Sequence, residues 1–179
     1  NDVRWLVAVG ADYGCISVVA DSPYKSLKDL MTAIKSDPTK VAIGGGGSVG
    51  SQDWTKVATL SKQVGIDPKA LRYVSFEGNG EVTTALLGGH IQAGSGDVSA
   101  DLPQHKAGKI RGLAVTSSKR AAAVPELPTV NEALGLKDYE LIAYFAVFAP
   151  AGTPPDIVAK LNQAINAAAN SKDIQDKFA

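Results

Sequence analysis

Residues 41–64 read VAIGGGGSVGSQDWTKVATLSKQV. Three apolar residues come first, four consecutive glycines follow, and the second half carries apolar residues spaced three and four apart. A short apolar run beside glycines is typical of a buried strand, and the later spacing is typical of an amphipathic helix that begins near Ser51. The segment therefore predicts a strand, a glycine-rich loop and a helix in direct succession, which is the repeating unit of α/β proteins.

The same succession repeats on both sides of this segment. Apolar and β-branched runs predict strands at residues 3–9, 15–20, 71–76, 91–94, 110–116 and 141–148, with a turn at 12–14 between the first two. Helical spacing and capping residues predict helices at residues 27–36, 51–64, 81–87, 100–106, 130–134, 156–169 and 172–178. Repeated β-α-β steps imply parallel pairing with right-handed crossovers. The sequence thus predicts an α/β fold with a mostly parallel sheet flanked by helices.

The composition excludes several classes of protein. The chain has 179 residues, 18 basic and 18 acidic, and a formal net charge of zero, so no long-range field attracts nucleic acid or anionic lipid. Cys15 is the only cysteine, which excludes an internal disulfide and a thiolate metal cluster and predicts a small buried apolar residue. The longest apolar run, residues 145–151, is far shorter than the ~20 residues that cross a bilayer. Residues 1–5 do not have the pattern of a secretory leader.

The glycine-rich loop is the candidate binding site. A helix N-terminus has free N–H groups and a partial positive charge, and glycines let an anion approach these groups closely. Ser48, Ser51 and Gln52 add side-chain donors at the same point. Similar polar loops are predicted after the strands at 71–76 and 91–94, in residues 77–80 and 95–99. Because parallel strands end at one edge of a sheet, the three loops predict a pocket for a compact, oxygen-rich solute.

Two other interpretations stay open at this point. Gly45, Gly47 and Gly50 have the spacing of the dinucleotide fingerprint G-x-G-x-x-G. The fingerprint needs a carboxylate about 20 residues later at a strand end, and the acids nearest that place, Asp67 and Glu77, come 17 and 27 residues after Gly50. No G-K-[ST] follows the glycines, which excludes a nucleotide P-loop. Alternatively, the glycines serve only turn formation, in a regulatory or scaffold module without a ligand.

Residues suited to catalysis are few. The two histidines, His90 and His105, are expected to be solvated side chains in a turn and on an exposed helix. The chain lacks the H-E-x-x-H spacing of zinc enzymes and the G-x-S-x-G of serine hydrolases. Asp97 has no predicted nucleophile or second carboxylate beside it. We therefore expect a protein that binds without chemistry, with no catalytic residue, no metal and no cofactor.

Six segments, in this order, resemble the substrate-binding proteins of tripartite tricarboxylate transporters, the TctC or Bug family. They cover nearly the whole chain and are SPYKSLKDL (22–30), GGGGSVGSQD (44–53), LLGGH (86–90), KAGKIRGLAVT (106–116), VPELPTV (124–130) and FAPAGTP (148–154). The resemblance implies a periplasmic-binding-protein-like fold of type II. It also implies a periplasmic receptor that closes on a di- or tricarboxylate and delivers it to a membrane permease, without contacting nucleic acid or entering the membrane.

The resemblance further implies a division of the chain and a set of ligand contacts. Residues 21–138 would be a complete second lobe, and residues 1–20 and 139–179 would be hinge strands and part of a first lobe whose remaining segment is expected before residue 1. Family members often carry a lysine at the position of Glu77, which leaves the charge of the ligand open. The carboxylate would be held by Gly46, Gly47, Ser48, Gly50, Ser51 and Gln52, with Gly78, Asn79 and Asp97 as neighbours.

Overall fold

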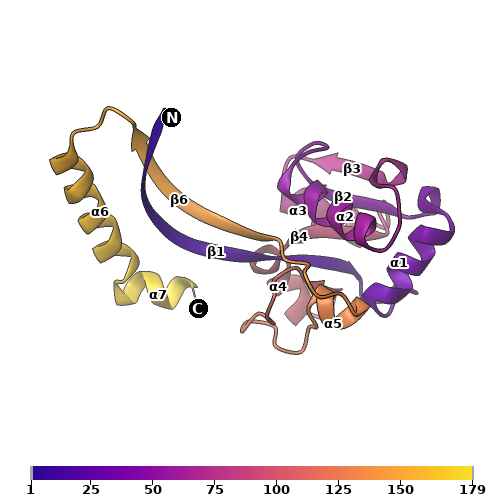
Figure 1. Cartoon of the computed structure of the whole chain (residues 1–179). Coiled ribbons are helices and arrows are strands. Elements are labelled where there is room, and N and C mark those ends of the chain that lie inside the picture. The colour runs from indigo at the N-terminus through magenta and orange to yellow at the C-terminus, as the bar shows by residue number, and fades with distance from the viewer. Residues whose placement is uncertain (1, 179) are drawn as a thin grey trace. The chain divides into compact units, whose positions relative to one another are not determined.

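The computed structural model describes residues 2–178, and their contacts divide them into two units (Figure 1). The larger unit runs from Asp12 to Ile142. The smaller unit combines the chain up to Ala11 with the chain from Ala143 onward. The larger unit thus includes residues 12–20 and 139–142 in addition to the range 21–138 that the sequence suggested for one lobe.

The larger unit is built on one mixed sheet with the strand order β3-β2-β4-β1-β5. Its strands are β1 (Val3–Val19), β2 (Ala42–Gly46), β3 (Arg72–Phe76), β4 (Ala93–Asp97) and β5 (Ile110–Val115). Strand β2 pairs in parallel with β3 and β4, as the β-α-β steps predict. Strand β1 is antiparallel to both of its neighbours, β4 and β5, so these two run in the same direction but do not pair. The predicted α/β fold with helices flanking the sheet is confirmed, and the antiparallel strand β1 makes the sheet mixed.

The expectation of two short strands at 3–9 and 15–20 is wrong, because β1 is one continuous strand of 17 residues. The predicted turn stays extended because Gly14 already pairs with Asp97 of β4, and its carbonyl oxygen accepts the N–H of Thr116 at 2.9 Å. These contacts give the backbone of Gly14 hydrogen-bond partners in the sheet, which it would lose if the chain reversed direction here. The boundary between the two units nevertheless falls inside this strand, between Ala11 and Asp12.

Helix α1 (Leu27–Ser36) forms as its sequence predicts. The hydroxyl of Ser26 accepts the N–H of Asp29 at 3.1 Å, and the Asp29 carboxylate accepts the N–H of Ser26 at 2.9 Å, which completes a capping box. The helix ends at Asp37, directly before Pro38. All four predicted apolar positions of the helix are buried, namely Leu27, Leu30, Met31 and Ile34. Together with Ile16, Val18, Ile43 and Leu60 they form the main core.

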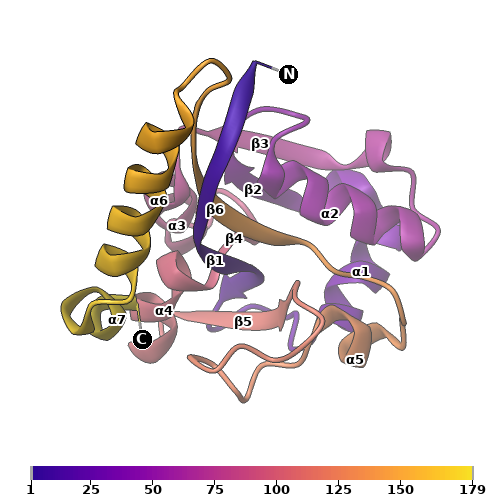
Figure 2. The ribbon, with the colours of Figure 1, turned by 60° about the vertical axis from the view of Figure 1, so that its left-hand side comes forward.

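The remaining helices of the larger unit also lie close to their predicted places. They are α2 (Gln52–Gln63), α3 (Asn79–Leu87), α4 (Val98–Lys106) and α5 (Val130–Leu134), with single 3-10 turns at Pro38–Lys40 and Pro68–Ala70. Helix α2 contacts both β2 and β4, and Figure 2 shows it lying across these strands. A second capping box, between Thr129 and Glu132, starts α5. Cys15 is buried in a small apolar cluster, as expected.

The smaller unit contains the first part of β1, all of strand β6 (Ile142–Pro150) except its first residue, and the helices α6 (Pro155–Ala169) and α7 (Lys172–Phe178). Strand β6 pairs with β1 (Figure 1). The rings of Tyr144 and Phe148 lie 6.4 and 5.9 Å from that of Trp5, and all three side chains are more than half exposed. Across the described residues 2–178, none of the helices has both the length and the apolar character needed to cross a membrane.

Gly14 lies in the segment that was predicted to be a turn, and the absence of a side chain there leaves room for Lys56. A Cβ atom at Gly14 would lie 2.8 Å from side-chain carbons of the buried Lys56, whereas one at Gly10 of the same strand would have nothing within 4 Å. We expect Gly14→Ala to lower the free energy of unfolding by about 1–3 kcal/mol through overpacking. Gly10→Ala should be neutral or slightly stabilising, because alanine restricts the unfolded chain more than glycine does. Urea denaturation of both variants measures the difference. Equal stabilities would show that the packing of Lys56 against β1 does not require glycine at position 14.

Candidate functional site

The predicted site residues lie at the edge of the sheet where β2, β3 and β4 end. These three strands run in the same direction and end at Gly46, Phe76 and Asp97. A loop connects β2 to α2, a shorter one connects β3 to α3, and α4 follows β4 without any loop. The expectation of a third loop at residues 95–99 is therefore wrong. Ser95 and Gly96 are buried strand residues, which pair with β1.

The glycine run belongs only partly to the loop. Gly44 and Gly45 are buried in β2, where the neighbouring side chains leave no room for a Cβ atom. At Gly45 that atom would lie 2.9 Å from Cβ of Asp53. The turn itself uses Gly47 and Gly50, whose φ angles of 76° and 96° are rarely adopted by other residues. The interpretation of the glycines as turn formers thus holds for part of the run, and the first glycine of the G-x-G-x-x-G match is not in the turn.

Several of the predicted contact residues use their polar groups to shape this loop. The N–H of Gly46 donates to Asp53 Oδ2 at 2.8 Å, and the Gly46 carbonyl accepts the Ser51 hydroxyl at 2.9 Å. The Ser51 hydroxyl also caps α2 by accepting the N–H of Trp54. The N–H of Gly47 donates to the carbonyl of Phe76 at 2.7 Å. These contacts hold the loop in one conformation.

Other N–H groups of the loop remain available. Within the described residues, the N–H groups of Ser48, Val49, Gly50, Gln52 and Asp53 donate no hydrogen bond to the protein. The Ser48 side chain is exposed as well and makes no hydrogen bond with the described chain. The last two of these N–H groups belong to the first turn of α2, where the helix dipole adds a partial positive charge. The arrangement can bind an anion through neutral donors.

A buried lysine holds this edge of the sheet together. Lys56 is fully buried, and its Nζ lies 2.8 Å from Asp53 Oδ1, 2.5 Å from Asp97 Oδ1 and 2.8 Å from the carbonyl oxygen of Gly96. The Ser95 hydroxyl donates to the carbonyl of Asp53 at 2.8 Å. The buried Tyr139 hydroxyl donates to the carbonyl of Lys56 at 2.9 Å. The ion pairs and hydrogen bonds therefore join α2 to the end of β4.

Burial and charge have opposite effects on the two titratable groups at the centre of this cluster. Burial lowers the pKa of Lys56, but the adjacent Asp53 and Asp97 outweigh burial and raise this pKa above its usual value. Burial raises the pKa of Asp97 above its usual value, and the ion pair with Lys56 limits that rise. Lys56 is therefore charged at neutral pH, and all three of its donor directions are taken up by the protein.

The structure brings the predicted neighbours Gly78, Asn79 and Asp97 to the same edge. A Cβ atom at Gly46 would lie 3.7 Å from Cα of Gly78, and one at Gly96 would lie 3.1 Å from Asn79 Oδ1. Gln52 Nε2 lies 3.5 Å from Asp97 Oδ1. All nine predicted contact residues therefore lie on or beside one edge of the sheet, and their contact with a ligand stays a prediction.

Glu77 lies at the end of β3, beside the glycine loop. It lines an open hollow together with Gly47, Ser48, Ser75, Phe76 and Glu81. The Glu81 carboxylate accepts the N–H of Glu77 at 3.0 Å, while the Glu77 side chain is exposed. The hollow thus carries two carboxylates, which oppose the entry of an anion from this side.

The sequence analysis missed Asp53, Lys56 and Tyr139. A signal was present for the first two, because Asp53, Lys56 and Val57 occupy the same helical face as Leu60. A charged pair three residues apart on an apolar face indicates a buried ion pair. The partner Asp97 lies 41 residues further along the chain, and Tyr139 lies 83 residues away. No local pattern predicts either of these contacts.

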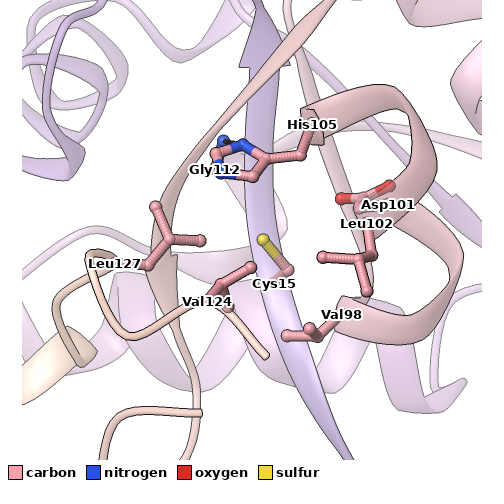
Figure 3. A pocket seen from close by; sticks show the side chains of 8 residues that line it. All are labelled: Cys15, Val98, Asp101, Leu102, His105, Gly112, Val124 and Leu127. Carbon is pink, nitrogen blue, oxygen red and sulfur yellow. Dashed lines mark hydrogen bonds between the residues drawn. The ribbon is translucent and has the colours of Figure 1, made fainter. Parts of the chain in front are cut away.

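A separate small cavity lies between α4, β1 and β5, and has a volume of about 10 Å³, enough for one water molecule (Figure 3). Cys15, Asp101 and His105 are among its lining residues. His105 is half-buried, not solvated as expected, since Nδ1 accepts the N–H of Gly112 at 3.4 Å and Nε2 pairs with Glu126 at 2.9 Å. His90 is exposed, as expected. Within the described chain, Asp101 Oδ2 is buried without a hydrogen-bond partner.

Comparison with known proteins gives a consistent result. A profile described as "Tripartite tricarboxylate transporter family receptor" matches residues 4–179. The protein BugT of Bordetella pertussis is 34% identical over 154 residues, which are 86% of this chain and 46% of BugT. A protein encoded in the gbd 5′ region of Cupriavidus necator is 32% identical over 180 residues, which are 100% of this chain and 53% of that protein. The chain thus spans about half the length of these relatives.

Solved structures agree with the sequence matches. Rpa4515 of R. palustris, solved with adipate, superposes with a TM-score of 0.85 at 28% identity and covers 99% of this chain and 57% of its own. MatC of Rhodopseudomonas palustris, solved with bound malate, superposes with a TM-score of 0.84 at 26% identity and covers 97% and 57%. The periplasmic binding protein BugD gives a TM-score of 0.85 at 25% identity, with coverage of 98% and 57%. The predicted fold, of the periplasmic-binding-protein type, is confirmed.

Removal of the buried lysine tests the role of the ion pairs. We expect Lys56→Met to lower the free energy of unfolding by about 3–5 kcal/mol, because Asp53 and Asp97 would be left without their cation. Lys62→Met removes the same charge from the exposed side of α2 and should change stability by no more than about 0.5 kcal/mol. Thermal and urea unfolding measure both variants. A stable Lys56→Met protein would show that the cluster is not required to hold the sheet edge.

The buried carboxyl group of Asp101, beside the cavity, should make the stability of the protein depend on pH. Burial raises the pKa of Asp101 to about 6, so the folded protein binds a proton more tightly than the unfolded chain does. The contribution of Asp101 to stability should therefore grow as the pH falls from 7 towards 4, by up to about 3 kcal/mol, because its pKa rises by about two. Asp101→Asn should remove this contribution, while Asp21→Asn, at an exposed site, should retain it. Urea unfolding between pH 4.5 and 8 decides, and parallel curves for wild type and Asp101→Asn would contradict the assignment.

Proposed function

Because the chain belongs to the receptor family of tripartite tricarboxylate transporters, we propose that the protein is a solute receptor of the periplasm. It binds a small di- or tricarboxylate and delivers it to the permease subunits of a transporter. The observation that carries this proposal is the loop between β2 and α2, whose free N–H groups point to an anionic ligand. The dinucleotide alternative is not favoured. Gly45, the first glycine of the G-x-G-x-x-G match, lies inside β2 and not in the turn, and the members of the family are described as receptors.

The chemistry of the loop suits reversible capture. Hydrogen bonds from neutral N–H groups to a carboxylate are charge-assisted and directional, and the helix dipole adds to them. Lys56, the lysine of the ion-pair cluster, is already paired with two carboxylates. The loop would therefore hold an anion without a salt bridge, and the solute would not need to displace an existing partner.

We assign no chemical transformation to the site. His90 is exposed, and His105 is paired with Glu126 beside the small cavity, so neither belongs to the predicted contact residues. We assign the larger unit to the second lobe of the receptor and the smaller unit to hinge strands and part of the first lobe. The remainder of the site in the whole receptor would come from the first lobe.

A ligand screen tests the proposed function. The protein expressed from the complete gene should unfold at a higher temperature in the presence of a matching di- or tricarboxylate, because a ligand at 100 times its Kd adds about 2.7 kcal/mol of stability. Ser48→Ala should weaken binding by about tenfold or more through loss of one hydrogen bond to a charged group. Ser36→Ala, at the exposed end of α1, is the matched control. No stabilisation by any organic acid, or saturable binding of NAD(H), would contradict the proposal.

A further inference from the structure

The carboxylate of Asp97 is held at one oxygen only. Asp97 is the last residue of β4 and occupies the cap position of α4, yet its side chain makes no capping hydrogen bond. Oδ1 instead lies 2.5 Å from Lys56 Nζ and 3.5 Å from Gln52 Nε2, the latter at the limit of a hydrogen bond. The cluster thus fixes the direction of the carboxylate without using its second oxygen.

The second oxygen of Asp97 reaches solvent at the predicted site. Oδ2 makes no hydrogen bond with any residue of the described chain, and it is not among the buried atoms that lack a partner. The Asp97 side chain retains 20% of its exposure, whereas that of Lys56 retains 1%. A hydrogen-bond acceptor whose other oxygen is held by Lys56 therefore remains accessible to solvent at the end of β4.

The charge of the cluster determines what this acceptor can bind. Lys56 supplies one positive charge, while Asp53 and Asp97 supply two negative charges, so the cluster carries one net negative charge. An ionised carboxylate has no donor, and it repels a carboxylate of a ligand at the same point. The amide oxygen of Asn79 faces Gly96 and is buried, without a hydrogen-bond partner in the described chain, so it is not presented to solvent. Asp97 is thus the side chain that discriminates.

We infer that the solute carries a hydroxyl or ammonium group next to one of its carboxylates, and that this group donates a hydrogen bond to Asp97 Oδ2. The inference rests on the proposed function, because the loop between β2 and α2 would hold the adjacent carboxylate. The class of solute is therefore a 2-hydroxy or 2-amino di- or tricarboxylate, in preference to the unsubstituted acid of the same length.

The solved relatives show that the fold is compatible with both kinds of solute. Rpa4515 was solved with adipate, which has no such donor, and MatC was solved with malate, which has a hydroxyl group. The choice between them therefore depends on side chains at the site and not on the fold. In this chain we assign the choice to Asp97, a specificity-determining residue.

Matched acids that differ at one position provide the experiment. Titration calorimetry on the protein expressed from the complete gene would compare succinate with malate, 2-methoxysuccinate and aspartate, and glutarate with 2-hydroxyglutarate and glutamate. The methoxy compound keeps the oxygen of malate but lacks its proton. In at least one length series, the hydroxy or amino acid should bind at least tenfold more tightly than both the unsubstituted acid and, for malate, the methoxy compound.

Two variants identify the residue responsible. Asp97→Asn should reduce the preference to about threefold or less while the unsubstituted acid binds equally or more tightly. Asp21→Asn removes an exposed charge that lies past the end of β1, away from Asp97, and should keep the preference. Unsubstituted acids that bind wild type as tightly as their hydroxy and amino partners in both length series would overturn the inference, whether or not the variant folds. A preference that survives in folded Asp97→Asn would also overturn it. If no acid of the panel binds, the proposed function itself fails.

Discussion

The charge of Lys56 must be neutralised inside the protein, and the way this happens links the elements around the candidate site. An isolated ammonium group in this position would cost several kcal/mol, and its contacts with Asp53, Asp97 and the Gly96 carbonyl offset that cost. Asp53 in turn accepts the N–H of Gly46 and thereby fixes the start of the glycine loop. One buried cation thus connects α2, the end of β2 and the end of β4.

The sequence predicts much of the larger unit because local patterns suffice there. The helix after Ser26 has its cap, its apolar spacing and its terminating Asp37 within a dozen residues, and the structure matches each of them. The course of β1 could not be predicted in this way. Its residues near Gly14 look like a turn, but they pair with Asp97 and Thr116, which lie more than 80 residues away. Contacts of such long range override a local turn preference.

In the candidate site, too, the sequence predicts the parts that depend on local patterns and misses the parts that depend on long-range contacts. The glycine loop and the start of α2 are visible in the sequence, because glycines and a capping serine act on their own neighbours. The end of β4 was expected to be a loop, since Ser95, Gly96 and Asp97 are typical turn residues. Burial against β1 and α2 makes them strand residues instead. The ion pair between Lys56 and Asp97 exists only once the sheet has formed, so it has no counterpart in any single segment.

The separation of backbone donors from side-chain acceptors at this edge has a consequence for how such receptors diversify. Every residue except proline has a backbone N–H group, so a substitution at Ser48 or Val49 would leave the free donors of the loop in place. The side chains of Gln52, Glu77 and Asp97 lie around that loop. Under the proposed function, a gene duplicate would therefore change its solute through one or two codon changes at these side chains and keep the backbone donors of the loop.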